Sequence, residues 1–277
     1  MHHEKERYGA LFSWKEVCQM VWTARFRSAL RAALWHLAFC ALVATTVAWV
    51  VFVVWFPSPL HELTGGRNLF LILMAVDLVC GPMLTLVLYD PAKSRLKWRV
   101  DLALIVLLQL GALVYGIGQV AAARPVFVAF EGDRFRVVQA FDVDMQRLPE
   151  ARDGMQSLPL LGPKLIGVRL AHPGDADYLA SVQMSTQGLH PSFRPSRWIP
   201  WGEQLPSLQA ELQPLSVLRE RHREDGATID AVLAEAGLLD SQMGYLPLVR
   251  EEITDWVAIV ERASGQPRAY LHLDGWR

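Results

Sequence analysis

The feature that most constrains this chain is an acidic residue inside an apolar run. Asp77 is the only charged residue from Asn68 to Tyr89, a run of 22 residues. A helix of that length can cross a bilayer, where a carboxylate is costly and usually serves a purpose. The run therefore predicts a membrane helix, and Asp77 marks a position where a partner could be held.

Two further runs, 37–56 and 102–123, carry no charged residue, and the first can be extended back to Ala32. At about 1.5 Å per residue, each covers the roughly 30 Å of hydrocarbon. A buried helix of a soluble protein rarely stays apolar on all sides for so long. We predict three transmembrane α-helices within residues 32–123.

The distribution of basic residues predicts the orientation of these helices. Six Lys and Arg precede the first helix and four lie between the second and third, but Arg67 stands alone between the first and second. The ten are Lys5, Arg7, Lys15, Arg25, Arg27, Arg31, Lys93, Arg95, Lys97 and Arg99. The positive-inside bias places the N-terminus in the cytoplasm and residues 124–277 on the far side of the membrane, which is the periplasm in a Gram-negative cell.

Residues 1–31 are predicted to be a cytoplasmic amphipathic segment, with an interfacial helix at 11–28. One face of that helix is apolar and is formed by Trp14, Val17, Cys18, Val21, Trp22 and Phe26. A translation start at Met20 is the alternative. We expect no cleavable signal peptide, because the first apolar run is too long and lacks a small-residue cleavage site.

Residues 124–277 read as a separate, mildly acidic domain with 16 Lys and Arg, 21 Asp and Glu, and no cysteine. The domain offers no basic surface to nucleic acid. We expect it to fold when expressed alone from about Arg124, without a disulfide or a metal, on its own hydrophobic core.

Sequence patterns predict an α+β fold for this periplasmic domain, with one sheet and helices on a face. The expected strands are 125–130, 135–140, 164–170, 245–250, 255–261 and 268–273. The expected helices are 175–186, 205–223 and 228–236, and residues 141–163 form a loop.

The sequence contains few residue patterns that are typical of catalytic sites. The sequence has no Walker loop, no G-x-S-x-G, no C-x-x-C and no H-E-x-x-H. Two D-x-D pairs, Asp142/Asp144 and Asp175/Asp177, match a pattern of metal-dependent sugar transferases but are also common in loops and at helix starts. We predict no catalytic residue, metal or cofactor.

The second membrane helix carries one polar or small stripe. Asp77, Gly81 and Thr85 are spaced four residues apart and share a face. Pro82 cannot donate to the carbonyl of Leu78, so the helix is expected to kink there.

The third helix has a similar face, formed by Gln109, Ala112, Gly116 and Gln119, with Tyr115 at its margin. Its small residues would let helices approach closely. Asp77 and Tyr115 fall at nearly the same depth. One interpretation is a protonated Asp77 that locks the bundle through Tyr115 or a glutamine. The others are contact with a partner's transmembrane helix and a proton or ion pathway.

Several motifs resemble those of the type IV pilin accessory proteins (the TfpX/TfpZ type). They are Asp77-x-x-x-Gly81-Pro82-x-Leu84-Thr85 followed by Pro91 and Lys93, Leu108-Gln109-Leu110 with Tyr115-Gly116, Arg194-Pro195-x-Arg197-Trp198-x-Pro200, and Tyr245-Leu246-Pro247-Leu248. The resemblance extends from about Arg25 to Trp276. It implies a non-enzymatic inner-membrane protein that helps a major pilin to be displayed as pili and contacts the pilin's transmembrane helix and periplasmic head.

The segment from Arg194 to Trp201 is the candidate for binding a pilin head. Arg194, Arg197, Trp198 and Trp201 are of the residue types that dominate contact hot spots. The alternative is that both Trp rings cap the core of the sheet.

Two other functions stay open at this point. A membrane-bound enzyme that modifies pilin or an envelope glycan would need a carboxylate pair or a metal site. A sensor would need a cytoplasmic output domain, whereas only residues 1–31 and one short loop are predicted to lie inside.

Overall fold

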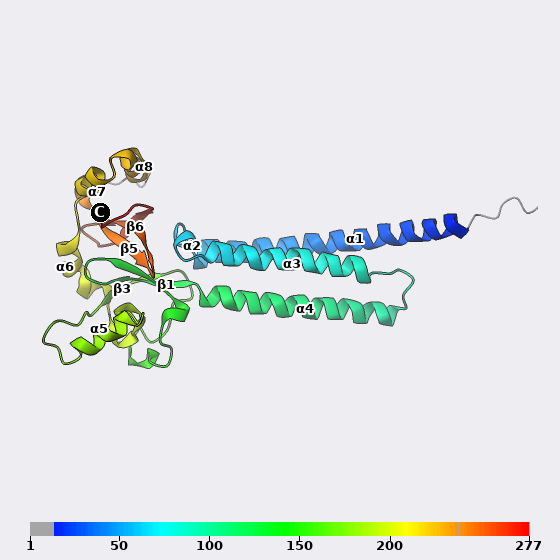
Figure 1. Cartoon of the computed structure of the whole chain (residues 1–277), viewed down its shortest axis with the longest axis horizontal. Helices are drawn as coiled ribbons and strands as arrows, with labels where there is room; N and C mark the ends of the chain where they lie inside the picture. Colours follow the sequence, from blue (N-terminus) through cyan, green and yellow to red (C-terminus); the bar gives the residue numbers. More distant parts are fainter. Residues whose placement is uncertain (1–13, 236, 238, 277) are drawn as a thin grey trace, which may run out of the picture. The chain divides into compact units, whose positions relative to one another are not determined.

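The computed structural model describes residues 14–235, 237 and 239–276 (Figure 1). Part of the predicted N-terminal segment, residues 1–13, lies outside this range. The chain divides into two compact units. One holds α1, Trp14–Trp49, together with Asn68–Gly118, and the other holds Val50–Arg67 and the chain from Gln119 onward.

Three helices are long and apolar enough to cross a membrane, as predicted. The candidate spans are Trp22–Trp55, Gly66–Leu88 and Arg95–Ala122. The first combines most of α1 with a π-helix, η1 (Val50–Trp55), and the others are α3 (Gly66–Leu88) and α4 (Arg95–Ala122). The chain is therefore a multi-pass membrane protein.

The predicted interfacial helix at 11–28 is not a separate element. From Trp14 the helix α1 runs without a break to Trp49. That stretch contains neither glycine nor proline and is rich in alanine, so nothing in it ends a helix.

The second unit is built on one mixed sheet of seven strands in the order β4-β3-β1-β2-β5-β6-β7. Its strands are β1 (Pro125–Phe130), β2 (Phe135–Gln139), β3 (Lys164–Val168), β4 (Trp198–Ile199), β5 (Met243–Arg250), β6 (Ile253–Glu261) and β7 (Pro267–Leu271). β1 runs parallel to β3, and β2 runs parallel to β5; the other neighbours are antiparallel. The predicted α+β fold with a single sheet is confirmed.

Helices cover both faces of this sheet, rather than one face as predicted. These helices are α2 (Leu60–Leu63), α6 (Trp201–Glu211), α7 (Leu215–Arg221) and α8 (Gly226–Glu235), and α5 (Tyr178–Thr186) belongs to the same unit. Successive residues of β5 belong to different core clusters: Leu246 packs in the cluster that includes residues of α6, and Tyr245 packs in the cluster that includes residues of α7 and α8. Because successive strand residues point to opposite faces, both faces are buried.

The single helix predicted at 205–223 is two helices, α6 and α7, separated at residues 212–214. Pro214 lacks the N–H that a continuous helix would need and stands at the N-cap of α7. The two-residue strand β4 was not predicted, because it is too short to show an alternating pattern.

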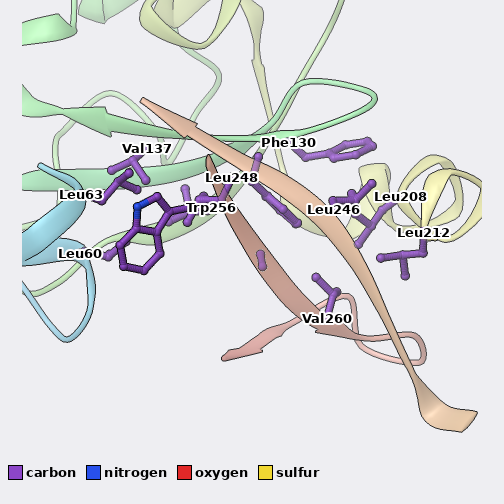
Figure 2. Close-up of a cluster of buried hydrophobic side chains, with 13 residues drawn as sticks. Leu60, Leu63, Phe130, Val137, Leu208, Leu212, Leu246, Leu248, Trp256 and Val260 are labelled. Carbon is purple, nitrogen blue, oxygen red and sulfur yellow. The ribbon is translucent and has the colours of Figure 1, made fainter. Parts of the chain in front are cut away.

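The segment between the first two spans is part of the sheet domain. Leu60 and Leu63 of α2 are 2% and 1% exposed and belong to the same core cluster as Val137, Leu248 and Trp256. Figure 2 shows the two leucines beside Val137 and Trp256. The predicted boundary at residue 124 therefore omits a piece of the domain that the sequence analysis gave to the membrane region.

Candidate functional site

A cavity of about 680 Å³ lies between α1, α3 and α4, the three long helices in Figure 1. Its wall is mostly apolar. The polar or ionisable side chains in the wall include His36, Cys40, Asp77, Thr85, Asp101 and Gln109. A concave, largely apolar site with a few placed polar groups is typical of a binding site.

His36 of α1 connects all three helices through its two ring nitrogens. Its Nδ1 lies 2.5 Å from Thr85 Oγ1 on α3, and its Nε2 lies 2.6 Å from Gln109 Oε1 on α4. Because an amide oxygen only accepts, His36 Nε2 must be the donor in the second bond. In the tautomer that carries its proton on Nε2 alone, the Thr85 hydroxyl donates to Nδ1. This network fixes the rotation of each helix about its axis.

The amide of Gln109 lies where Gly81 leaves space on α3. Gln109 Nε2 donates to the backbone carbonyl of Asp77 at 3.4 Å and to Cys40 Sγ at 3.7 Å. A Cβ at position 81 would overlap the Gln109 amide, so glycine permits the close approach of the two helices. The stripe of Asp77, Gly81 and Thr85 thus faces the other helices of the bundle.

The carboxyl group of Asp77 lines the cavity and has no hydrogen-bond or ion-pair partner among the residues that the structure describes. The other acid in the wall, Asp101, is paired with Lys93 Nζ at 2.5 Å. An unpaired carboxyl group at membrane depth is costly and marks a functional position. Asp77 therefore has bonding capacity left for a partner in this cavity.

The interpretation in which Asp77 bonds Tyr115 or a glutamine differs from the observed contacts: no Asp77–Tyr115 bond is present among the described side chains, and Gln109 bonds the backbone carbonyl of Asp77 rather than its carboxyl group. Tyr115 is 71% exposed and does not line the cavity. Tyr115 follows Gln109 by six positions, which on an α-helix turns the two side chains roughly 120° apart. The three helices are instead joined by two hydrogen bonds of His36, one to Thr85 and one to Gln109.

The small residues of α4 differ in their surroundings. Leu73 of α3 occupies the space where a Cβ of Gly116 would be, whereas Gly118 faces open space. Pro82 lies inside α3, which continues to Leu88. Close helix approach thus occurs at Gly81 and Gly116.

Four of the eight residues in the segment Arg194–Trp201, predicted to bind a pilin head, are buried, and they include three of the four predicted contact residues. Arg194 and Arg197 are each 5% exposed and Trp198 is 1% exposed. Burial lowers the pKa of the Arg194 guanidinium. Their donors are used inside the domain: Arg194 Nη2 bonds Ser181 Oγ (2.8 Å), Arg197 pairs with Asp177, and Trp198 Nε1 bonds the Ser192 carbonyl (2.7 Å).

Trp201 also has a structural environment. It is partly buried against the core, with its ring centroid 6.1 Å from that of Phe135. Its Nε1 donates to the carbonyl of Ser264 at 3.4 Å. Both Trp rings therefore pack on the core of the sheet, which was the alternative interpretation.

Three of the four D-x-D carboxylates accept hydrogen bonds from nearby backbone N–H groups, and the fourth forms an ion pair. Asp142 accepts from Gln139 (2.8 Å), Asp144 from Gln146 (3.2 Å) and Asp175 from His172 (2.9 Å), while Asp177 pairs with Arg197. Within the described ranges, no three His, Cys, Asp or Glu side chains are grouped as metal ligands.

His36 is a site residue that sequence reasoning missed, as are Cys40 and Asp101 of the cavity wall. His36 stands one residue before the charge-free run 37–56 and inside the candidate span Trp22–Trp55. An ionisable side chain within a membrane helix is itself a signal for a functional site. Its partners could not be foreseen, because they depend on the rotation of three helices.

Comparisons with known proteins relate this chain to fimbrial assembly proteins. The model of the family "fimbrial assembly protein FimB" matches residues 24–65, which cover much of the first span and α2. Fimbrial assembly proteins of Dichelobacter nodosus, serogroups E1 and I, are each 29% identical over 242 residues, 86% of this chain and 93% of their own length. No solved structure matches the chain.

A further Dichelobacter nodosus protein, the fimbrial assembly protein of serogroups C1 and C2, is 35% identical over 127 residues. The match covers 46% of this chain and 97% of that protein. The resemblance to pilin accessory proteins is thereby confirmed at the level of fimbrial assembly. The chain belongs to the fimbrial assembly protein FimB family.

Proposed function

We propose that this protein is a pilin-specific accessory protein of the bacterial inner membrane that promotes the assembly or surface display of type IV pili. It acts by binding a major pilin and catalyses no reaction. Membership of a fimbrial assembly family and three candidate membrane spans support this proposal. A pilin subunit that waits in the membrane presents an apolar helix, and the helix bundle offers a surface for it.

The proposed topology has the N-terminus in the cytoplasm and residues 124–277 in the periplasm. Ten Lys and Arg precede the first span or join the second and third, against Arg67 between the first and second. α2 packs into the sheet domain, so α2 and the sheet domain must lie on the same side of the membrane. The three-span topology meets this condition, because two spans lie between α2 and the sheet domain.

The observation that carries the proposal is the unpaired Asp77 carboxyl group in the cavity. A partner helix in the same bilayer could offer this group a hydrogen-bond donor or a positive charge at membrane depth. Polar groups of this kind strengthen helix association in a membrane. The sheet domain contributes through surfaces other than the buried Arg194, Arg197 and Trp198.

The test replaces Asp77 by asparagine, which removes the charge and keeps an amide of similar size. Cys80→Ser is the matched control, since Cys80 is an exposed residue of the same helix and lies outside the cavity wall. Immunoblots should show normal abundance for both variants. Crosslinking to pilin and the yield of sheared surface pili should fall only for Asp77→Asn.

Normal piliation and normal crosslinking in the Asp77→Asn strain would refute the charge-dependent contact and leave Asp77 as a residue of the bundle. Reduced abundance would instead indicate a structural role. Pulldown of the accessory protein with the major pilin from the Cys80→Ser strain establishes that the assay detects the pair.

A further inference from the structure

The loop before β3 carries two adjacent exposed leucines. Leu160 and Leu161 are 73% and 76% exposed. Pro159 and Gly162 flank them, and Gly162 has a φ of 58°, in the left-handed region that favours glycine. The chain therefore bends at this point and presents two large apolar side chains that nothing in the described part of the domain covers.

This loop lies beside the ends of two candidate membrane spans. A Cβ built on Gly162 would be 3.6 Å from the carbonyl oxygen of Val54, which is in the last turn of the first span. Arg124 connects the loop to the end of α4. Its Nη1 donates to the Ala121 carbonyl at 2.6 Å, and its Nη2 donates to the Pro159 carbonyl at 3.4 Å.

A third exposed apolar side chain, Phe141, lies next in the chain to a residue that is hydrogen-bonded to Arg124. The N–H of its neighbour Ala140 donates to the Arg124 carbonyl at 3.0 Å. Phe141 is 55% exposed. The side-chain amide of Gln139, at the end of β2, donates to the carbonyls of Ala123 and Thr64. This end of β2 is therefore hydrogen-bonded to residues next to the second and third spans.

We propose that Leu160 and Leu161 insert into the interfacial layer of the same bilayer that the helices cross, with Phe141 beside them. Spans that end at Trp55 and Ala122 place the membrane surface near Val54 and Arg124. Apolar side chains at that level gain from leaving water, and a neighbouring Arg suits lipid phosphates. The loop thereby fixes the sheet domain against the membrane surface.

This inference depends on the membrane spans and is independent of the proposed role with pilin. The test uses the full chain reconstituted into vesicles of phosphatidylethanolamine and phosphatidylglycerol. An environment-sensitive fluorescent amino acid is introduced at Leu160, at Leu161 or, as the matched control, at Leu179. Leu179 is 78% exposed and lies on α5 of the sheet domain.

The expected result is blue-shifted emission at positions 160 and 161, quenched by brominated lipid and protected from aqueous iodide. The probe at position 179 should be quenched by iodide and unaffected by brominated lipid. Iodide quenching at 160 and 161 equal to that at 179 would overturn the proposal. Protection that appears only after purified pilin is added would also overturn it, because the leucines would then contact protein rather than lipid.

Discussion

Replacing Leu60 or Leu63 by alanine should destabilise the sheet domain, although both residues lie between the first two membrane spans. Each side chain is almost completely buried in the cluster that contains Val137, Leu248 and Trp256. Buried Leu→Ala changes cost about 2–5 kcal/mol through lost burial and the cavity left behind. A typical domain is stable by only about 5–15 kcal/mol, so the double variant should lose much of its stability.

The assay is urea unfolding of the full chain in detergent micelles, with pulse proteolysis used to measure the folded fraction of the sheet domain. Glu62→Ala is the matched control, because Glu62 is in the same short helix and its side chain is 51% exposed. That change should alter the free energy of unfolding by less than about 0.5 kcal/mol. The reasoning fails if Leu60→Ala and Leu63→Ala unfold at the same urea concentration as Glu62→Ala.

The same packing changes what is expected of residues 124–277 expressed alone. That fragment needs no disulfide, but it lacks the two leucines and exposes Val137, Leu248 and Trp256 to water. We expect it to aggregate or to melt without cooperativity, and a fragment that also carries residues 56–67 through a linker to melt cooperatively. A cooperative melt of 124–277 alone, at the same temperature as the longer fragment, would contradict this prediction.

Three further predictions concern single residues. Gly81→Ala should lower protein abundance on an immunoblot, because a Cβ there overlaps an amide of α4, whereas Gly118→Ala, with open space around it, should not. Arg136→Met should lower the free energy of unfolding by about 3–5 kcal/mol, because it leaves Glu131, its partner at 2.8 Å, as a buried unpaired charge; no change in the urea midpoint would refute this. Burial raises the pKa of Tyr270 to about 12; the ordinary value is about 10, so its contribution to stability is intact below about pH 10 and is lost as the pH rises towards 12. Tyr270→Phe should reduce this alkaline loss of stability, and an unchanged pH profile would count against it.

The features predicted correctly from the sequence are those encoded by local patterns. A charge-free run long enough to cross a bilayer predicts a span by itself, and the alternation on either side of Glu131 and Asp133 predicts the hairpin of β1 and β2. The stripe of Asp77, Gly81 and Thr85 follows from four-residue spacing alone. Each of these inferences uses only residues close together in the chain.

The features that were missed depend on contacts between distant residues. Nothing in the sequence near Leu60 and Leu63 indicates that they fill the core of a sheet formed by later residues. The depths of Tyr115 and Asp77 in the membrane suggest a pair, but Tyr115 lies on a side of α4 that does not line the cavity and is exposed. For Trp198 the sequence leaves two interpretations open, a contact surface and the core of the sheet, because aromatic residues occur in both, and the structure places Trp198 in the core.

Site-specific photocrosslinking in living cells tests most directly whether the cavity between the helices receives a pilin. A photoreactive amino acid is placed at Leu110 or Leu113, which line the cavity, or at Leu107, a 71% exposed residue of α4 outside its wall. The account predicts a covalent adduct with the major pilin at positions 110 and 113, reduced by Asp77→Asn, and little or none at 107. Absence of the adduct at 110 and 113 in cells that make normal pili, or equal adducts at all three positions, would contradict it.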